Sequence, residues 1–120
     1  MTQKGSILAQ PEELNTIDVG AIYVVEGIGY DFVPEVLSRD VGVVDSWIKT
    51  SDEEAFSAVQ VLMRKEGLLV GGSSGSALAG AIQWLTTTAT GRTLANTPEA
   101  NVVVLLPDGY VYCLAVTSTE

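Results

Sequence analysis

The apolar and polar positions between residues 51 and 66 have the clearest period in the chain, and they predict an amphipathic helix. Its apolar side chains recur at helical spacing and would share one face: Ala55, Phe56, Val59, Leu62 and Met63. Ser51 and Glu54 form the signature of a capping box, and the first turn is acidic, which suits the positive end of the helix dipole. We therefore expect a helix that buries one face and ends at Gly67, a residue suited to a left-handed stop.

Short apolar runs on either side of this helix predict buried strands. These runs contain many β-branched residues and cover 21–25, 41–44, 68–70 and 101–106. A second helical spacing extends from Ala77 to Leu85, directly after a glycine-serine loop at 71–76. Residues 34–39 predict one or two helical turns, and the polar, breaker-rich stretch 86–100 predicts a connection.

This alternation of strands and helices predicts an α/β fold with a largely parallel sheet and flanking helices. Ligands of such folds bind at the carboxyl ends of the strands. Two glycine-containing loops, 26–31 and 71–76, follow predicted strands, so both are candidate binding loops. A chain of 120 residues has room for one domain or for part of a larger one.

Charge and composition exclude several classes of function. Six basic and fifteen acidic residues give a net charge of −9, which opposes binding to nucleic-acid phosphates or to an anionic membrane surface. No apolar run approaches the roughly 20 residues that span a bilayer, so we expect a cytoplasmic protein. The chain has no histidine and one cysteine, Cys113, so no metal site and no imidazole-activated nucleophile is expected.

The loop 71–76 has the chemistry of a polar ligand site. Its glycines allow a ligand close to the backbone, its serines offer hydroxyls, and a predicted helix begins directly behind it. A tight strand-to-helix connection whose serines cap the helix explains the same residues equally well. No lysine follows the glycines, which excludes a nucleotide phosphate loop.

The loop 26–31 is a weaker candidate when judged by its residues alone. Gly27 and Gly29 could begin a dinucleotide fingerprint, but Phe32 stands where the third glycine is needed. What remains is a strand end carrying Glu26, Tyr30 and Asp31, which ordinary turn residues would also explain.

Five segments together resemble the cystathionine β-synthases in order and spacing. They are 5–8, 25–32, 45–49, 51–56 and 67–76, and the combination of Glu-Gly-Ile-Gly-Tyr-Asp-Phe with the later Gly-Gly-Ser is specific to that branch. The resemblance implies that residues 1–109 correspond to the C-terminal portion of the catalytic core, within the large domain of a type II pyridoxal-phosphate enzyme. Residues 110–120 depart from the family pattern and are expected to be a tail.

The resemblance also implies roles for both loops. Ser73 would hydrogen-bond the pyridine nitrogen of pyridoxal phosphate, Gly71, Gly72 and Gly75 would shape that contact, and Pro107 and Asp108 would flank the polar edge of the ring. Gly27, Gly29, Tyr30 and Glu26 would face the amino-acid substrate. A neutral hydroxyl does not hold the ring nitrogen protonated, which favours β-elimination over transamination. The implied reaction condenses serine with homocysteine to give cystathionine and water.

The chain departs from the family at the Schiff-base lysine. Its lysines are Lys4, Lys49 and Lys65, and none stands in the family's Ser-x-Lys context. No catalytic residue is therefore assigned, and we expect a truncated homologue that binds the cofactor weakly or not at all and is inactive alone. Two alternatives are a non-catalytic protein that associates with full-length homologous subunits and a small anion-binding module at 71–76.

Overall fold

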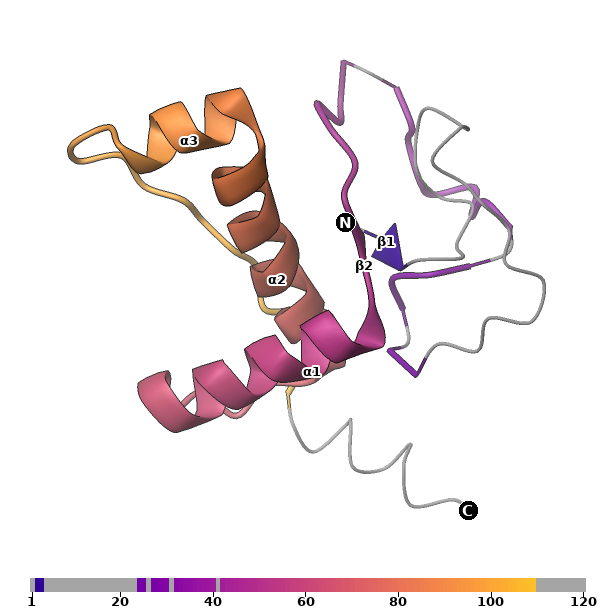
Figure 1. The fold of residues 1–120 in the computed structure, drawn as a ribbon. Helices are drawn as coiled ribbons and strands as arrows, with labels where there is room; N and C mark the ends of the chain where they lie inside the picture. Colours follow the sequence, from indigo (N-terminus) through magenta and orange to yellow (C-terminus); the bar gives the residue numbers. More distant parts are fainter. Residues whose placement is uncertain (1, 4–23, 26, 31, 41, 110–120) are drawn as a thin grey trace.

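The computed structural model describes residues 2–3, 24–25, 27–30, 32–40 and 42–109. Two short strands, β1 (Thr2–Gln3) and β2 (Lys49–Thr50), pair in parallel with Thr2 opposite Lys49. Three helices follow: α1 (Asp52–Val61), α2 (Gly72–Thr87) and α3 (Ala89–Ala95), as Figure 1 shows. The sheet in this part of the chain consists of β1 and β2, so the α/β class with a largely parallel sheet stays a prediction.

The predicted helix after Ser51 is confirmed, together with its capping box. The Ser51 N–H donates to Glu54 Oε2 (2.7 Å), and the Glu54 N–H donates to Ser51 Oγ (3.4 Å). The last turn, Leu62–Glu66, is π-helical, and the Leu62 carbonyl accepts from both Gly67 and Leu68. Gly67 has φ of 70°, the left-handed stop that the sequence predicts.

The second helix begins five residues earlier than its apolar spacing predicts. Residues 71–76 are not a loop: Gly71 is the N-cap of α2, and Gly72 to Ser76 form its first turns. Glycine and serine have low helix propensity, but these six residues are all buried, and contacts with the rest of the protein hold them in the helix.

Several shorter expectations are wrong in the described residues. The stretch 86–100 contains α3, which is capped by a hydrogen bond from the Gly91 N–H to Thr88 Oγ1 (2.9 Å). Within 34–39 the chain forms a turn at 34–37 and no helix, and 42–44 form a turn rather than a strand. Of the predicted strand 68–70, only Val70 pairs, through an antiparallel bridge to Gly109, and 101–106 pair with no strand. Residues 21–23 lie outside the described part of the chain.

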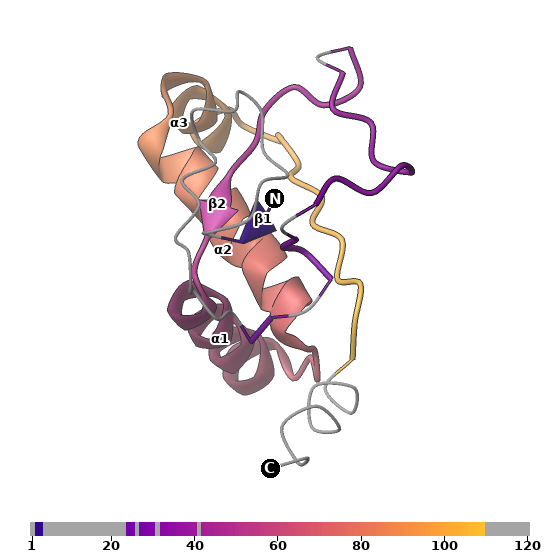
Figure 2. The same ribbon diagram turned by 90° about the vertical axis from the view of Figure 1, so that its right-hand side faces the viewer.

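Helix α1 crosses the start of α2 at close range, and Figure 2 shows the two helices in contact from a second direction. A Cβ atom on Gly75 would lie 2.5 Å from Val59 Cγ2 and 3.0 Å from the backbone carbon of Ala55. The first distance is shorter than carbon atoms tolerate, and the second is tight enough that the neighbour would have to shift. Beside this crossing, Val59, Leu62 and Val70 form a small buried core, with Met63 and Leu78 packed against it.

We predict that Gly75→Ala lowers the free energy of unfolding by about 1–3 kcal/mol, because the added methyl group overpacks the crossing. Helix propensity alone would make alanine more stable than glycine by about 1 kcal/mol, so a loss of stability in the variant would be due to the packing effect. Urea denaturation followed by circular dichroism measures it. Gly42→Ala is the matched control, since a Cβ at Gly42 meets no atom within 4 Å. Equal stability of the two variants would contradict the prediction.

Candidate functional site

Asp108 is hydrogen-bonded to the first turn of α2 through its side chain and its backbone. The Ser74 N–H and the Ser74 hydroxyl donate to Asp108 Oδ1 at 3.0 Å and 2.6 Å. In return, the Asp108 N–H donates to Ser74 Oγ (3.3 Å), and the Asp108 carbonyl accepts from the Gly71 N–H (3.3 Å). A carboxylate therefore lies at the positive end of the helix dipole, where a negative charge is stabilised.

These hydrogen bonds also determine the ionisation of Asp108. Partial burial raises the pKa of its carboxyl group, but hydrogen bonds from the side chains and backbone amides of Ser74 and Ser73 outweigh burial and hold the pKa below its ordinary value. Asp108 is consequently an anion at neutral pH, and it supplies its own negative charge to the start of α2.

The predicted ring-nitrogen partner, Ser73, lies in this same turn. Its side chain is 9% exposed and interacts with Asp108. The two glycines before it allow neighbouring side chains to approach: a Cβ on Gly71 would lie 2.7 Å from Asp108 Cγ, and one on Gly72 would lie 3.0 Å from Val25 Cγ2. Gly71, Gly72, Ser73 and Asp108 thus come together, while the roles that the resemblance implies for them stay predictions. Gly75 instead faces α1, and Pro107 is exposed.

The second predicted loop starts beside the first. The N–H groups of Val24 and Val25 donate to the two carboxylate oxygens of Asp52, at 2.8 Å and 3.2 Å. Val25 is 3% exposed and lies over Gly72, so the chain enters this loop next to the start of α2.

Within the second loop, Gly27 has φ of 81°, a left-handed conformation that glycine adopts without strain, and Gly29 is buried. Tyr30 is half-buried, with its ring 5.1 Å from that of Phe32. Glu26 and Asp31 lie outside the described residues, as does the tail 110–120.

Three buried hydroxyls support the site without having been assigned a role from the sequence. Ser74, Ser76 and Thr50 are each at most 1% exposed, and Ser76 Oγ lies 2.5 Å from Thr50 Oγ1. This hydrogen bond joins the end of β2 to α2, while Ser74 joins α2 to Asp108. The serine-rich stretch was the feature of the sequence that could have indicated these contacts, because buried hydroxyls in a helix need hydrogen-bond partners from other segments.

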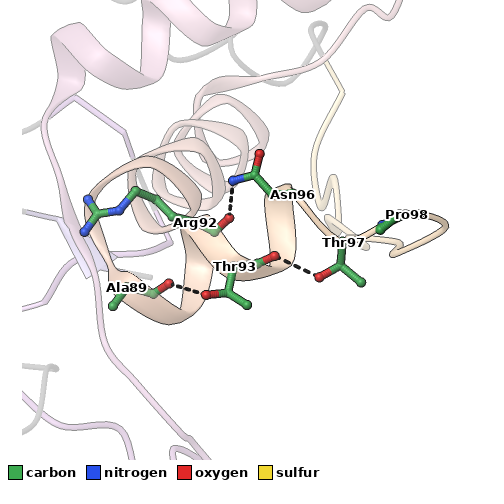
Figure 3. Close-up of a pocket in the computed structure, with 6 residues that line it drawn as sticks. All are labelled: Ala89, Arg92, Thr93, Asn96, Thr97 and Pro98. Carbon is green, nitrogen blue, oxygen red and sulfur yellow. Dashed lines mark hydrogen bonds between the residues drawn. The ribbon is translucent and has the colours of Figure 1, made fainter.

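Other hollows of the structure offer weaker chemistry. The hollow in Figure 3 lies on α3 and is lined by Ala89, Arg92, Thr93, Asn96, Thr97 and Pro98. Its polar side chains donate to nearby backbone carbonyls: Asn96 Nδ2 to Arg92 (2.7 Å), Thr97 Oγ1 to Thr93 (2.8 Å), and the Arg92 guanidinium to Thr86 and Thr87 at the end of α2. Across the described ranges no three metal-binding side chains converge, and none of the helices there is long and apolar enough to cross a membrane.

We predict that Asp108→Asn lowers the free energy of unfolding at neutral pH by about 1 kcal/mol, near the low end for a hydrogen bond to a charged group because Asp108 is partly exposed. A depressed pKa stabilises the fold above the ordinary carboxyl value, and this contribution is lost as the pH falls from that value through the lowered pKa of the folded protein. The wild-type protein should therefore lose stability more steeply than D108N between about pH 5 and pH 3.

Urea titrations at several pH values measure this difference in slope. Asp45→Asn is the control, because Asp45 is exposed and makes no hydrogen bond to another described residue. Parallel pH profiles for wild type and D108N would contradict the prediction.

Known proteins resemble this chain strongly over part of their length. No family model matches the chain. Cystathionine β-synthase of Oryctolagus cuniculus is 59% identical over 80 residues, which cover 67% of this chain and 14% of that protein. The Saccharomyces cerevisiae enzyme is 54% identical over 80 residues (67% and 15%), and that of Apis mellifera is 48% identical over 107 residues (88% and 19%). The chain therefore spans less than a fifth of the length of these relatives, and by its sequence it belongs to the cystathionine β-synthase family.

Proposed function

We propose that this chain contributes the ring-nitrogen side of a pyridoxal phosphate site in a cystathionine β-synthase. The observation that carries the proposal is the buried position of Ser73 in the first turn of α2, beside Asp108. The family relationship supports the proposal, because the relatives share the segment that contains this turn. On this basis the α/β fold would be that of the large domain of a type II pyridoxal-phosphate enzyme.

The donor groups at this turn fit one end of the cofactor. A pyridine nitrogen needs a single hydrogen-bond donor or acceptor in a polar but largely dry environment, and a serine hydroxyl that is 9% exposed meets that need. Gly71 and Gly72 keep the space beside Ser73 clear of side chains of their own, so Asp108 and Val25 approach closely. The fit covers the ring nitrogen, and covalent attachment falls to groups elsewhere.

The positions of the two described lysines support the view that covalent attachment of the cofactor falls to groups elsewhere. Lys49 lines a hollow with Trp47 and Trp84, where burial lowers its pKa. Trp84 and Ser73 are separated along α2 by about 16 Å, at 1.5 Å per residue, so the hollow that Lys49 lines lies toward the other end of the helix. Lys65 is exposed in the last turn after α1. Neither lysine is proposed as the Schiff-base residue.

The residues of the chain would act by binding and orienting. When bound, pyridoxal phosphate supplies the electron sink for β-replacement, here of the serine hydroxyl by homocysteine. Ser73, whose hydroxyl donates to Asp108 in this structure, would turn that hydroxyl to the ring nitrogen, and Asp108 would keep its bonds from Ser74 and thereby hold the turn that carries Ser73. Gly27, Gly29 and Tyr30 would border the amino-acid substrate, with Glu26 next to them and Pro107 at the edge of the ring.

The two alternatives from the sequence stay predictions without an observation that favours them. A small anion-binding module would use the N-terminus of α2, but the Asp108 carboxylate already accepts hydrogen bonds there. Association with full-length subunits would involve the outer surface of the chain and not the site at the start of α2.

A comparison of two ligands tests the proposal. Pyridoxal phosphate and its analogue with CH in place of the ring nitrogen carry the same phosphate, so only the nitrogen distinguishes them. We expect weak binding in which wild type prefers the natural cofactor by about 3- to 10-fold, the worth of one hydrogen bond, and in which Ser73→Ala loses this preference. Quenching of Trp47 and Trp84 fluorescence or calorimetry measures both affinities.

Ser57→Ala on the exposed face of α1 is the matched control and should keep the preference. Equal affinities of wild type for the two ligands, or a preference that survives in S73A, would overturn the assignment of Ser73. Competition by inorganic phosphate without any preference would instead favour the anion-binding alternative.

A further inference from the structure

The carboxylate of Asp52 binds the backbone that leads into the loop 27–30. Asp52 is the first residue of α1, and its two oxygens accept hydrogen bonds from the N–H groups of Val24 (2.8 Å) and Val25 (3.2 Å). Hydrogen bonds to a charged acceptor are about twice as strong as bonds between neutral groups. Two such bonds from successive amides fix both the position and the direction of the chain as it enters the loop.

The side chain of Val25 connects the same backbone to the start of α2. Val25 is 3% exposed, and its Cγ2 would lie 3.0 Å from a Cβ atom on Gly72, the residue before Ser73. The entrance of the loop 27–30 is therefore held to α1 by hydrogen bonds and to α2 by close packing.

The position of Asp52 relative to α2 is fixed by contacts on either side of it in the sequence. Before it, Thr50 is buried, and its Oγ1 lies 2.5 Å from Ser76 Oγ in α2. After it, the backbone of Ala55 lies against Gly75, where a Cβ atom would come within 3.0 Å of the Ala55 carbonyl carbon. The carboxylate is thus carried by a segment that is attached to the first turns of α2 at two points.

We propose that Asp52 is a positioning residue that holds the substrate loop, residues 27–30, in place against the turn that carries Ser73. The inference rests on the proposed function, which puts the amino-acid substrate at this loop. Asp52 contacts neither substrate nor cofactor in this assignment, and it acts through the backbone at 24–25. Loss of its two bonds should weaken binding of the amino-acid part of a ligand and leave the contact at the ring nitrogen unchanged.

Helix stabilisation is the other role that an acidic residue has at this place, and a neighbouring residue separates the two roles. Asp52 and Glu53 both lie in the first turn of α1, where a negative charge favours the helix. Glu53 is exposed, and its side chain makes no hydrogen bond to another described residue. Glu53→Gln therefore removes the same charge from the same turn without removing a bond to the loop.

Hydrogen exchange of the chain without any ligand tests whether Asp52 holds the loop. We expect the amides of Val24 and Val25 to exchange about tenfold faster in D52N than in E53Q, the effect of losing a hydrogen bond to a charged group. The amides of 27–30 should also exchange faster in D52N. Those of α3, which is distant in sequence from both sites, should respond equally in the two variants.

Two stable ligands test whether the loop serves the substrate. Phosphopyridoxyl-serine, in which serine is joined to the cofactor through a secondary amine, carries the amino-acid part that pyridoxamine phosphate lacks. We expect wild type and E53Q to bind the serine conjugate about 3- to 10-fold more tightly, the worth of one hydrogen bond, and D52N to lose most of this gain. D52N should keep the preference for a ring nitrogen over CH, because that preference depends on Ser73.

Three results would overturn the role of Asp52. They are equal exchange of the loop amides in D52N and E53Q, a gain from the serine part that survives in D52N, and a loss of the nitrogen preference together with that gain, which indicates a general structural role. Absence of a nitrogen preference in wild type would instead contradict the proposed cofactor site, and the exchange experiment distinguishes that failure because it needs no ligand.

Discussion

The hydrogen bonds between Asp108 and Ser74 are the interaction on which the arrangement of the other elements depends. The first turn of α2 is buried, so its N–H groups cannot be satisfied by water. Asp108 comes from the other end of the chain, 34 residues away, and provides both an acceptor and a negative charge at that turn. By doing so it brings the returning segment 101–109 alongside α2 and lets a glycine- and serine-rich sequence stay helical.

The packing around residues 71–76 also depends on the absence of side chains at the three glycines, and each glycine leaves room for a different neighbour. Gly71 leaves space for the Asp108 carboxylate, Gly72 for the Val25 side chain, and Gly75 for the backbone of α1. A run that resembles a flexible loop is therefore buried and closely packed. Such packing keeps Ser73 in one place, which a residue that positions a ligand requires.

The relationship to the cystathionine β-synthase family is the basis on which we relate this packing to a cofactor site. The relatives extend far beyond the matched segment, since the chain covers 14–19% of their length. In our proposal this segment holds one edge of a cofactor, and the hydrogen bonds of Ser74 and Ser76 keep that edge in register with Asp108 and Thr50.

The sequence by itself determined the features that depend on near neighbours in the chain. The capping box of Ser51 and Glu54, the face of α1 and the left-handed stop at Gly67 follow from contacts within a few residues, and they were predicted correctly. The grouping of Gly71, Gly72, Ser73 and Asp108 was anticipated through the family resemblance. Glu26 lies outside the described residues, and the roles of Gly27, Gly29 and Tyr30 stay predictions.

Only the tertiary structure decided where α2 begins, what Gly75 contacts and that Ser74 rather than Ser73 makes the main bonds to Asp108. Each depends on a residue far away in the sequence: Asp108 for the helix start and for the bonds of Ser74, and Ala55 for Gly75. Local propensity disfavours a helix through glycines and serines, and long-range hydrogen bonds and burial outweighed it. The apolar pattern at 102–106 shows the converse, because it indicates a strand, but a strand forms only where another backbone supplies the hydrogen bonds.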